Sequence, residues 1–236
     1  MVRVLELDPD LGSGLPREEW PAAVQAVVGT LDEHAPGIWD PARDLRERLG
    51  GVIVGGLAVS HLALAETVSA ELLAAGDVIV PDTSPPVSFL PARAEHLVLE
   101  PLRVVWLGSS YERAACRWPQ LSRTLMQRLH WRTRRATLLQ TIAQLTRIDD
   151  RVLIMLWHLA ERFGRVGNDG VVVPVRLTHR VIARLVGARR PSVTTAISAL
   201  QRRGIIQRRA DGAWLLLERP SVSAAALIDM RDVGAV

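Results

Sequence analysis

The chain has 236 residues, of which 48% are hydrophobic and 23% are charged. This composition supports one large or two small cores and excludes a wholly disordered chain. Cys116 is the single cysteine, which excludes a disulfide framework, a four-cysteine zinc site and an iron–sulfur cluster held by one chain. The N-terminus lacks a basic start followed by an apolar run, and stretches such as Val52–Val59 are too short to span a bilayer. We therefore expect a soluble cytoplasmic protein with no membrane partner.

Charge is unevenly distributed along the chain. The formal net charge is +4, and all 29 basic residues are arginine. Residues 1–111 carry a net charge of −9, whereas residues 112–146 carry +6 and residues 147–219 carry +8. Because a polyanion is attracted to a positive surface, this asymmetry predicts that only the second half of the chain meets one.

The N-terminal half has the pattern of a small β-domain. A short helix is expected within Trp20–Leu31, and residues 50–110 contain short apolar runs separated by turn signals such as Gly55-Gly56, Gly76-Asp77 and Pro85-Pro86. This spacing is typical of a small barrel or sandwich. The expected strands are Gly51–Val59, Val68–Leu73, Asp77–Val80, His96–Leu99 and Leu102–Leu107.

Residues 112–146 are predicted to form one long helix with Pro119 in an early turn. An apolar stripe comprises Leu121, Leu125, Leu129, Ala136, Leu139 and Ala143, widened by Leu138, Ile142 and Leu145. A separate basic stripe comprises Arg128, Arg132 and Arg135. So long a helix needs a partner surface, and the same helix of a second chain is the natural one. The alternative is a surface within its own subunit.

Residues 147–219 are predicted to form helices followed by a hairpin. Asp149 or Asp150 is placed to cap the first helix. The turn Arg209–Ala213, which contains Asp211-Gly212, predicts the hairpin. The expected elements are helices at Arg151–Phe163, His179–Val186 and Pro191–Arg203, and strands at Val171–Val175, Ile205–Arg208 and Trp214–Leu217. The tail from Pro220 carries an apolar patch, Ala224–Ile228, to which we assign no role.

The segment THRVIARLVGARRPSVTTAISALQRRGII, residues 178–206, meets the physical demands of a helix-turn-helix. Ala183 is small where two helices approach closely, Gly187 permits the tight turn, and Val193 returns to the core. Thr178 can cap the first helix, and Pro191 lies in a first turn, where its missing N–H costs nothing. The apolar face is completed by Ile182, Val186, Ile197 and Leu200.

The outward face of the second predicted helix carries short polar side chains, which allow a helix to enter the major groove of DNA closely. Arg190, with Arg189, is the best candidate for bidentate guanine recognition. The predicted DNA contacts are Thr178, Arg180, Arg189, Arg190, Pro191, Ser192, Thr194, Thr195, Ser198, Arg202, Arg208 and Arg209, and the last three, with Arg203, are expected to contact phosphate. A generic helical hairpin is the alternative, but the following hairpin and the local charge of +8 argue against it.

This segment resembles the DNA-binding domain of the Crp/Fnr (catabolite-activator type) transcription regulators. The stretches ELLAAGDVIV and VVWLGSSYERAACRWPQLSRTLMQRL resemble the end of that family's β-roll and the passage into its dimer helix. The resemblance implies an α+β fold with a cupin-like β-roll (a double-stranded β-helix), a long dimerisation helix and a C-terminal winged helix-turn-helix. The implied segments are a sensor-like domain 1–111, the dimer helix 112–146, the DNA-binding domain 147–219 and a tail 220–236. It also implies a homodimer on a roughly palindromic site in double-stranded DNA, with RNA polymerase as a further partner.

Two departures from the family pattern stand out. Members often present an Arg-Glu pair and a second Arg to the bases, whereas here Pro191 and Thr195 replace the acid and the second Arg. Nucleotide-binding members follow a Gly-Glu pair with Arg-Ser or Arg-Thr, whereas here Gly76-Asp77 is followed by no such cassette, and Arg93-Ala94 is its nearest remnant. A phosphate needs a charged fork and several N–H donors, so we expect a cyclic-nucleotide-binding-like domain without that nucleotide and an unknown effector.

Enzymatic chemistry is not predicted. His61 and His96 could face the inside of a roll, but a catalytic metal usually needs three protein ligands, so both are interpreted as ordinary histidines. We expect no catalytic residues, no metal and no cofactor. The alternatives are a β-roll enzyme with a DNA-binding appendage and a module that uses its winged helix to bind protein. Cys116 is interpreted as a structural thiol.

Overall fold

The computed structural model describes residues 1–45, 48–81 and 92–220 and divides into two compact units, Met1–Thr141 and Ile142–Val236. The turn expected at Pro85-Pro86 and the apolar patch Ala224–Ile228 lie outside the described residues. Across the part that is described, no helix is long and apolar enough to cross a membrane.

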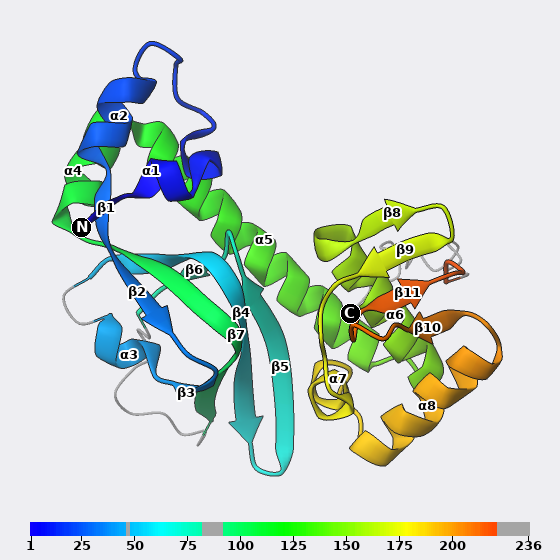
Figure 1. The fold of residues 1–236 in the computed structure, drawn as a ribbon. Helices are drawn as coiled ribbons and strands as arrows, with labels where there is room; N and C mark the ends of the chain where they lie inside the picture. The colour runs from blue at the N-terminus through cyan, green and yellow to red at the C-terminus, as the bar shows by residue number, and fades with distance from the viewer. Residues whose placement is uncertain (46–47, 82–91, 221–236) are drawn as a thin grey trace, which may run out of the picture. The chain divides into compact units, whose positions relative to one another are not determined.

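Unit 1 is built on an antiparallel sheet (Figure 1). The strands are β1 (Val2–Arg3), β2 (Val28–His34), β3 (Gly37–Trp39), β4 (Gly50–Leu64), β5 (Thr67–Ala74), β6 (Val78–Ile79) and β7 (Arg93–Leu107). They follow the order β1-β2-β7-β4-β5, with β3 also paired to β7 and β6 to β4. The short helices are α1 (Val4–Leu7), the 3-10 turn η1 (Pro9–Gly12), α2 (Trp20–Ala26) and α3 (Pro41–Asp44).

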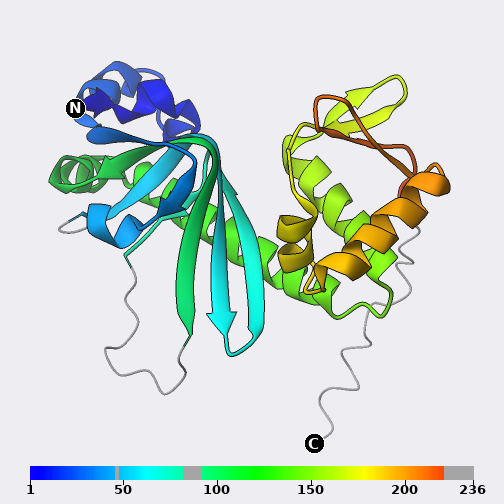
Figure 2. The ribbon, with the colours of Figure 1, turned by 60° about the horizontal axis from the view of Figure 1, so that its bottom comes forward.

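Two apolar cores hold this unit together. One lies inside the sheet around Trp39, Ile53 and Trp106. The other joins α1 and η1 to the following helices through Leu5, Tyr111 and other buried side chains. Figure 2 shows α1 and α2 grouped at one end of the long strands. Burial of these side chains stabilises unit 1 at about 1.5–3 kcal/mol for each large apolar residue.

The helix expected within Trp20–Leu31 is shorter than predicted, because α2 ends at Ala26 and β2 begins at Val28. Gly29 explains the change. A Cβ there would lie 2.6 Å from the carbonyl oxygen of Trp106, so only glycine lets β2 approach β7 this closely. Residues from Val28 onward therefore pair with β7 as a strand and do not continue the helix.

The turn expected at Gly55-Gly56 is instead an irregularity within β4, where the register with β7 shifts. Gly56 has φ +85°, and a Cβ there would lie 2.0 Å from the carbonyl oxygen of Pro101. Proline cannot donate to a sheet ladder and is tolerated at bulges. This local break allows β7 to run through Pro101 as one strand, where the sequence pattern predicted two.

The helix predicted over residues 112–146 is broken into α4 (Ser109–Arg117) and α5 (Pro119–Ala143). The residue before a proline is disfavoured in the α conformation, and Trp118 accordingly adopts φ −123° and ψ 83°. Trp118 is buried, and its indole N–H donates to the carboxylate of Glu19. The break is thus fixed by Pro119 and anchored by Trp118.

The basic stripe of α5 and the first part of its apolar stripe turn toward the roll of their own chain. Leu121 is fully buried in the core, and Leu125 packs against the same core, which agrees with the packing alternative rather than with a dimer seam at these positions. The basic stripe makes ion pairs with the roll: Arg128 with Asp8, Arg132 with Glu71 and Arg135 with Asp77. Met126, Trp131 and Leu138 remain exposed on α5, so Leu138 does not belong to the buried part of the apolar stripe.

The two histidines of the roll differ in their surroundings. His61 is buried on β4. His96 on β7 stacks edge-on against Trp39, with ring centroids 5.7 Å apart, and burial and the charge of Arg132 lower its pKa, against the opposing effects of Glu71 and Asp40. Among the residues that the structure describes, no three His, Cys, Asp or Glu side chains gather in a way that could hold a metal ion.

Candidate nucleic-acid interface

Unit 2 is a small helical domain with a twisted sheet (Figure 1). Its elements are α6 (Ile148–Phe163), β8 (Arg165–Gly167), β9 (Gly170–Val173), α7 (His179–Leu185), α8 (Arg190–Arg202), β10 (Ile206–Arg208) and β11 (Trp214–Leu216). The sheet order is β10-β11-β9-β8. The sequence pattern located β9 but missed its partner β8.

The cap expected from Asp149 or Asp150 is absent, because α6 begins earlier, with Arg147 at the N-cap position and no side-chain cap.

The helix-turn-helix is built from a buried apolar face and one glycine turn. Ile182, Val193 and Leu200 are buried between α7, α8 and α6. Thr178 caps α7, since its hydroxyl accepts a hydrogen bond from the backbone N–H of Val181 at 3.3 Å. Pro191 lies in the first turn of α8. These features agree with the spacing that the sequence displays.

Gly187 makes the turn between α7 and α8. Its φ of +61° is a left-handed conformation that L side chains adopt at a cost, and a Cβ there would lie 3.2 Å from the Cβ of Ala143. The backbone N–H of Ala188 donates to the carbonyl of Ala183 at 2.9 Å. Arg151 of α6 donates to the carbonyl of Gly187 at 3.2 Å. The turn is therefore held by one hydrogen bond to the end of α7 and by another from α6.

The outward face of α8 presents Arg190, Pro191, Thr194, Thr195 and Ser198, all of which are exposed, while Ser192 is half-buried. The Thr194 and Thr195 hydroxyls donate to the carbonyls of Arg190 and Pro191, at 3.1 and 3.2 Å. Their remaining lone pairs can accept hydrogen bonds, which suits exocyclic amino groups of bases. Thr178, Arg180, Arg189, Arg202 and Arg209 are exposed as well.

His179 belongs to this surface, and the sequence interpretation missed it. Its Nδ1 lies 3.0 Å from the hydroxyl oxygen of Thr194. Because that hydroxyl donates to the helix, the ring nitrogen is the donor in this contact. Burial and the positive charges of Arg208 and Arg190 lower the pKa of His179. His179 thus lies within the electrostatic influence of both arginines.

The arginines around α8 are held to different degrees. Arg208 lies over the Trp214 ring at 4.3 Å and donates to the carbonyl of Leu177 at 3.1 Å, so it is part of the hairpin's structure. Arg203 lies 3.5 Å from the Asp149 carboxylate, and Arg209 lies 3.8 Å from that of Asp211. Arg209 and Asp211 are both exposed, and a contact of this length between exposed groups is weak, which leaves Arg209 available to another anion.

The hairpin β10–β11 ends in the tight turn that Asp211-Gly212 predicts. Gly212 has φ +85°. The Asp211 carboxylate accepts from the backbone N–H of Ala213 at 2.9 Å. A Cβ at Gly212 would lie 3.3 Å from the side chain of Arg176, a further basic residue beside the turn that the sequence interpretation did not single out. Its place next to the turn depends on tertiary packing, and no local pattern reveals it.

Residues 150–222 match the family described as the Crp-like helix-turn-helix domain. A Porphyra purpurea protein provisionally named HTH-type transcriptional regulator ycf28 is 36% identical over 53 residues, which are 22% of each chain. The aligned part thus spans about a fifth of that curated relative.

Solved structures show the same fold. A cyclic nucleotide-binding domain-containing protein from Listeria monocytogenes superposes with a TM-score of 0.66 at 15% identity, covering 89% of this chain and 96% of that one. A CRP-family transcriptional regulator from Thermus thermophilus superposes with a TM-score of 0.58 at 17% identity, covering 79% and 92%. The α+β fold class and the resemblance predicted from the sequence are confirmed.

Proposed function

We propose that this chain, which carries a Crp-like helix-turn-helix domain within the fold of the Crp/Fnr regulators, is a DNA-binding transcription regulator. It acts as a cytoplasmic homodimer on a roughly palindromic site in double-stranded DNA. In this assignment residues 1–111 are a sensor-like domain, the 112–146 region supplies the dimer contact, and residues 147–219 bind DNA without catalysing a reaction. RNA polymerase is the partner that such a regulator would contact.

The observation that carries this proposal is the exposed face of α8 beside the hairpin. Arg190, Thr194 and Thr195 project from it, and Arg209 lies exposed on the turn of the hairpin. A helix in the major groove reads bases through such side chains, and arginines at its margins neutralise phosphates. We assign Arg190 to guanine, for which one bidentate pair discriminates by about 1–3 kcal/mol.

Pro191 and Thr195 narrow the range of target sequences. Pro191 offers only an apolar surface, which suits a thymine methyl group, and Thr195 offers one hydroxyl. Neither can form the bidentate contacts of the acid and arginine that stand at these positions in many family members. We infer that the site differs from the operator of the catabolite activator.

The dimer contact is assigned to the exposed face of α5. Trp131 and Leu138 lie seven residues apart on one face of this 25-residue helix and are 53% and 39% exposed. A second copy of the helix would cover these side chains by a two-fold operation, and a two-fold dimer places two α8 helices on inverted half-sites.

A regulator without cyclic nucleotide is consistent with the contacts of the roll. Arg132 hydrogen-bonds Glu71 and donates to the carbonyl of Val78 at 3.0 Å, and Arg135 pairs with Asp77. These two helix arginines are therefore neutralised by the roll's own carboxylates. A nucleotide phosphate would have to displace those carboxylates.

The proposal is tested by comparing two arginine variants in a binding assay against many DNA sequences. Arg190→Ala should flatten the base preference at one position of each half-site. Arg209→Ala should weaken binding to all sequences about equally and reduce the salt slope by about 1 for each subunit, or about 2 for the dimer. Equal effects of both variants on base preference would overturn the assignment. DNA affinity that does not depend on the bases would favour a protein-interaction module, and a metal in the purified protein would favour a β-roll enzyme.

A further inference from the structure

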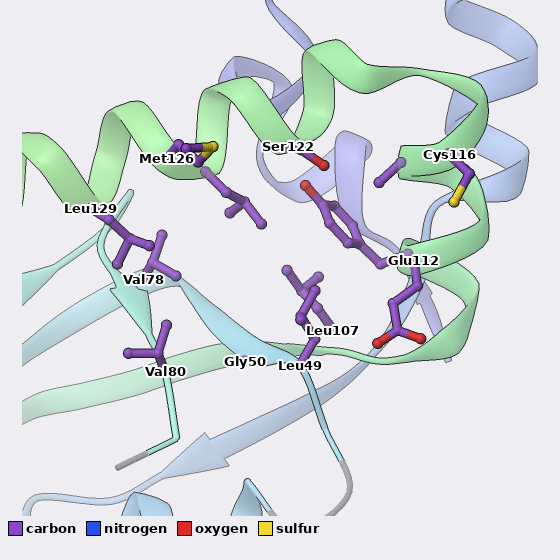
Figure 3. A pocket seen from close by; sticks show the side chains of 13 residues that line it. Leu49, Gly50, Val78, Val80, Leu107, Glu112, Cys116, Ser122, Met126 and Leu129 are labelled. Atoms are coloured by element: carbon purple, nitrogen blue, oxygen red, sulfur yellow. The ribbon is translucent and has the colours of Figure 1, made fainter. Parts of the chain in front are cut away.

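A cavity of about 450 Å³ lies in unit 1, at the elbow between α4 and α5 (Figure 3). Its walls come from the residue before β4 (Leu49), from β6 and the residue after it (Val78, Val80), and from both helices. In Figure 3 the labelled side chains of Val78, Leu129 and Ser122 border one open space. Pockets for small molecules are typically apolar hollows of roughly 300–1,000 Å³ with a few polar groups, and this cavity lies within that range.

One buried polar group in the wall has no partner. The side chain of Tyr111 is 1% exposed, and its hydroxyl oxygen has no hydrogen-bond partner among the described residues. Burial raises the pKa of Tyr111, against the opposing charge of Arg128, so the phenol keeps its proton and remains a donor. Arg128 cannot accept that proton, because a guanidinium is a donor only and this one is bound to Asp8.

An unpaired buried hydroxyl destabilises a fold relative to a paired one. A molecule that brings an acceptor into the cavity would remove that penalty. The remaining wall is mainly aliphatic, and Glu112 is its only charged lining residue among the described residues. A negative group at the rim opposes anions, including nucleotides. The ligand class that fits is therefore neutral and largely apolar, with one hydrogen-bond acceptor.

We propose that this cavity is a binding site for a neutral, apolar small molecule of roughly 15 non-hydrogen atoms, whose carbonyl or ether oxygen accepts a hydrogen bond from Tyr111. The site is separate from the ion pairs of Arg132 and Arg135, since none of their residues lines it. Because α4, α5 and the roll all supply walls, a bound molecule would contact each of them. The proposal does not depend on DNA binding.

The probe for this site is 6-propionyl-2-(dimethylamino)naphthalene, a neutral ketone whose emission shifts to the blue in apolar surroundings and to the red when the ketone accepts a hydrogen bond. Titrated into the full chain, it should give saturable, blue-shifted emission with one site per chain. Tyr111→Phe should weaken binding about 2- to 10-fold, the usual loss for one neutral hydrogen bond. The same variant should shift the bound emission further to the blue, which a purely structural effect would not do.

A matched pair of variants locates the probe. Ser122→Phe fills the cavity from α5 and should weaken binding more than 10-fold, whereas Gln127→Phe adds the same side chain to an exposed position outside the cavity and should leave binding unchanged. Circular dichroism confirms that each variant is folded. The anionic dye 8-anilinonaphthalene-1-sulfonate should compete poorly, and Glu112→Gln should improve its competition.

Three results would overturn the proposal. Absence of saturable binding is the first. The second is equal binding by wild type, Ser122→Phe and Tyr111→Phe. The third is probe affinity that falls as the chain concentration rises and dimers form, which would identify the groove as a contact between two copies. Because the assay contains no DNA, its failure is distinguishable from failure of the proposed regulatory function.

Discussion

Removal of one partner from the Arg128–Asp8 ion pair should strongly destabilise unit 1. The two side chains are only 14% and 10% exposed, and Nη2 of Arg128 lies 2.8 Å from Oδ1 of Asp8. Asp8→Asn would leave a guanidinium charge buried without a counter-ion, which costs about 3–5 kcal/mol. In a unit of this size the midpoint of thermal unfolding should fall by roughly 10 °C.

Differential scanning calorimetry of the full chain measures this effect, because the two units can unfold in separate transitions. The matched control is Arg134→Met, since Arg134 is exposed on the other side of α5 and stacks on Trp131; it should change the unfolding free energy by less than about 0.5 kcal/mol. Asp8→Asn combined with Arg128→Met should cost less than the sum of the single variants, with a coupling of about 0.5–3 kcal/mol. Equal, small effects of Arg128→Met and Arg134→Met would refute the assignment of the basic stripe to the roll.

Two further predictions concern unit 2. Gly204 has φ +71° with nothing within 4 Å of a Cβ, so Gly204→Ala should cost only the left-handed strain, about 1 kcal/mol. Gly187→Ala adds the 3.2 Å contact with Ala143 and should cost about 2 kcal/mol in urea unfolding; equal costs would show that the turn is not packed as described. Since burial, Arg208 and Arg190 lower the pKa of His179, the unfolded state binds more protons just below pH 6.5, and the unfolding free energy should fall as the pH drops through that value. His179→Gln should flatten this dependence, and an unchanged pH profile in urea titrations would contradict the cause assigned to the shift.

The helix-turn-helix could be predicted in detail because its determinants are local. A small residue, a glycine and a β-branched residue at fixed intervals specify how two consecutive helices meet, and the structure has Ala183, Gly187 and Val193 in those roles. The capping role of Thr178 follows from the same short-range chemistry. The predicted DNA contacts themselves stay predictions.

The partners of α5 could not be predicted, because a helical stripe indicates which residues share a face but not what covers it. Asp8, Glu71 and Asp77, which neutralise the basic stripe, lie 58 or more residues away along the chain. The role of Arg208 likewise depends on Trp214, which folding brings beneath it. The break at Trp118, by contrast, follows from a local rule, because the residue before a proline is disfavoured in the α conformation. The apolar pattern continues across this position, and for that reason the sequence predicted one unbroken helix.

The most direct test of the account is selection of bound fragments from a genomic DNA library by the full chain at moderate salt. Two α8 helices related by a two-fold axis should enrich an inverted repeat whose half-sites are centred about 10 base pairs, or roughly 34 Å, apart or a multiple of that distance. Enrichment without an inverted repeat, or recovery of fragments with no shared sequence, would contradict the account.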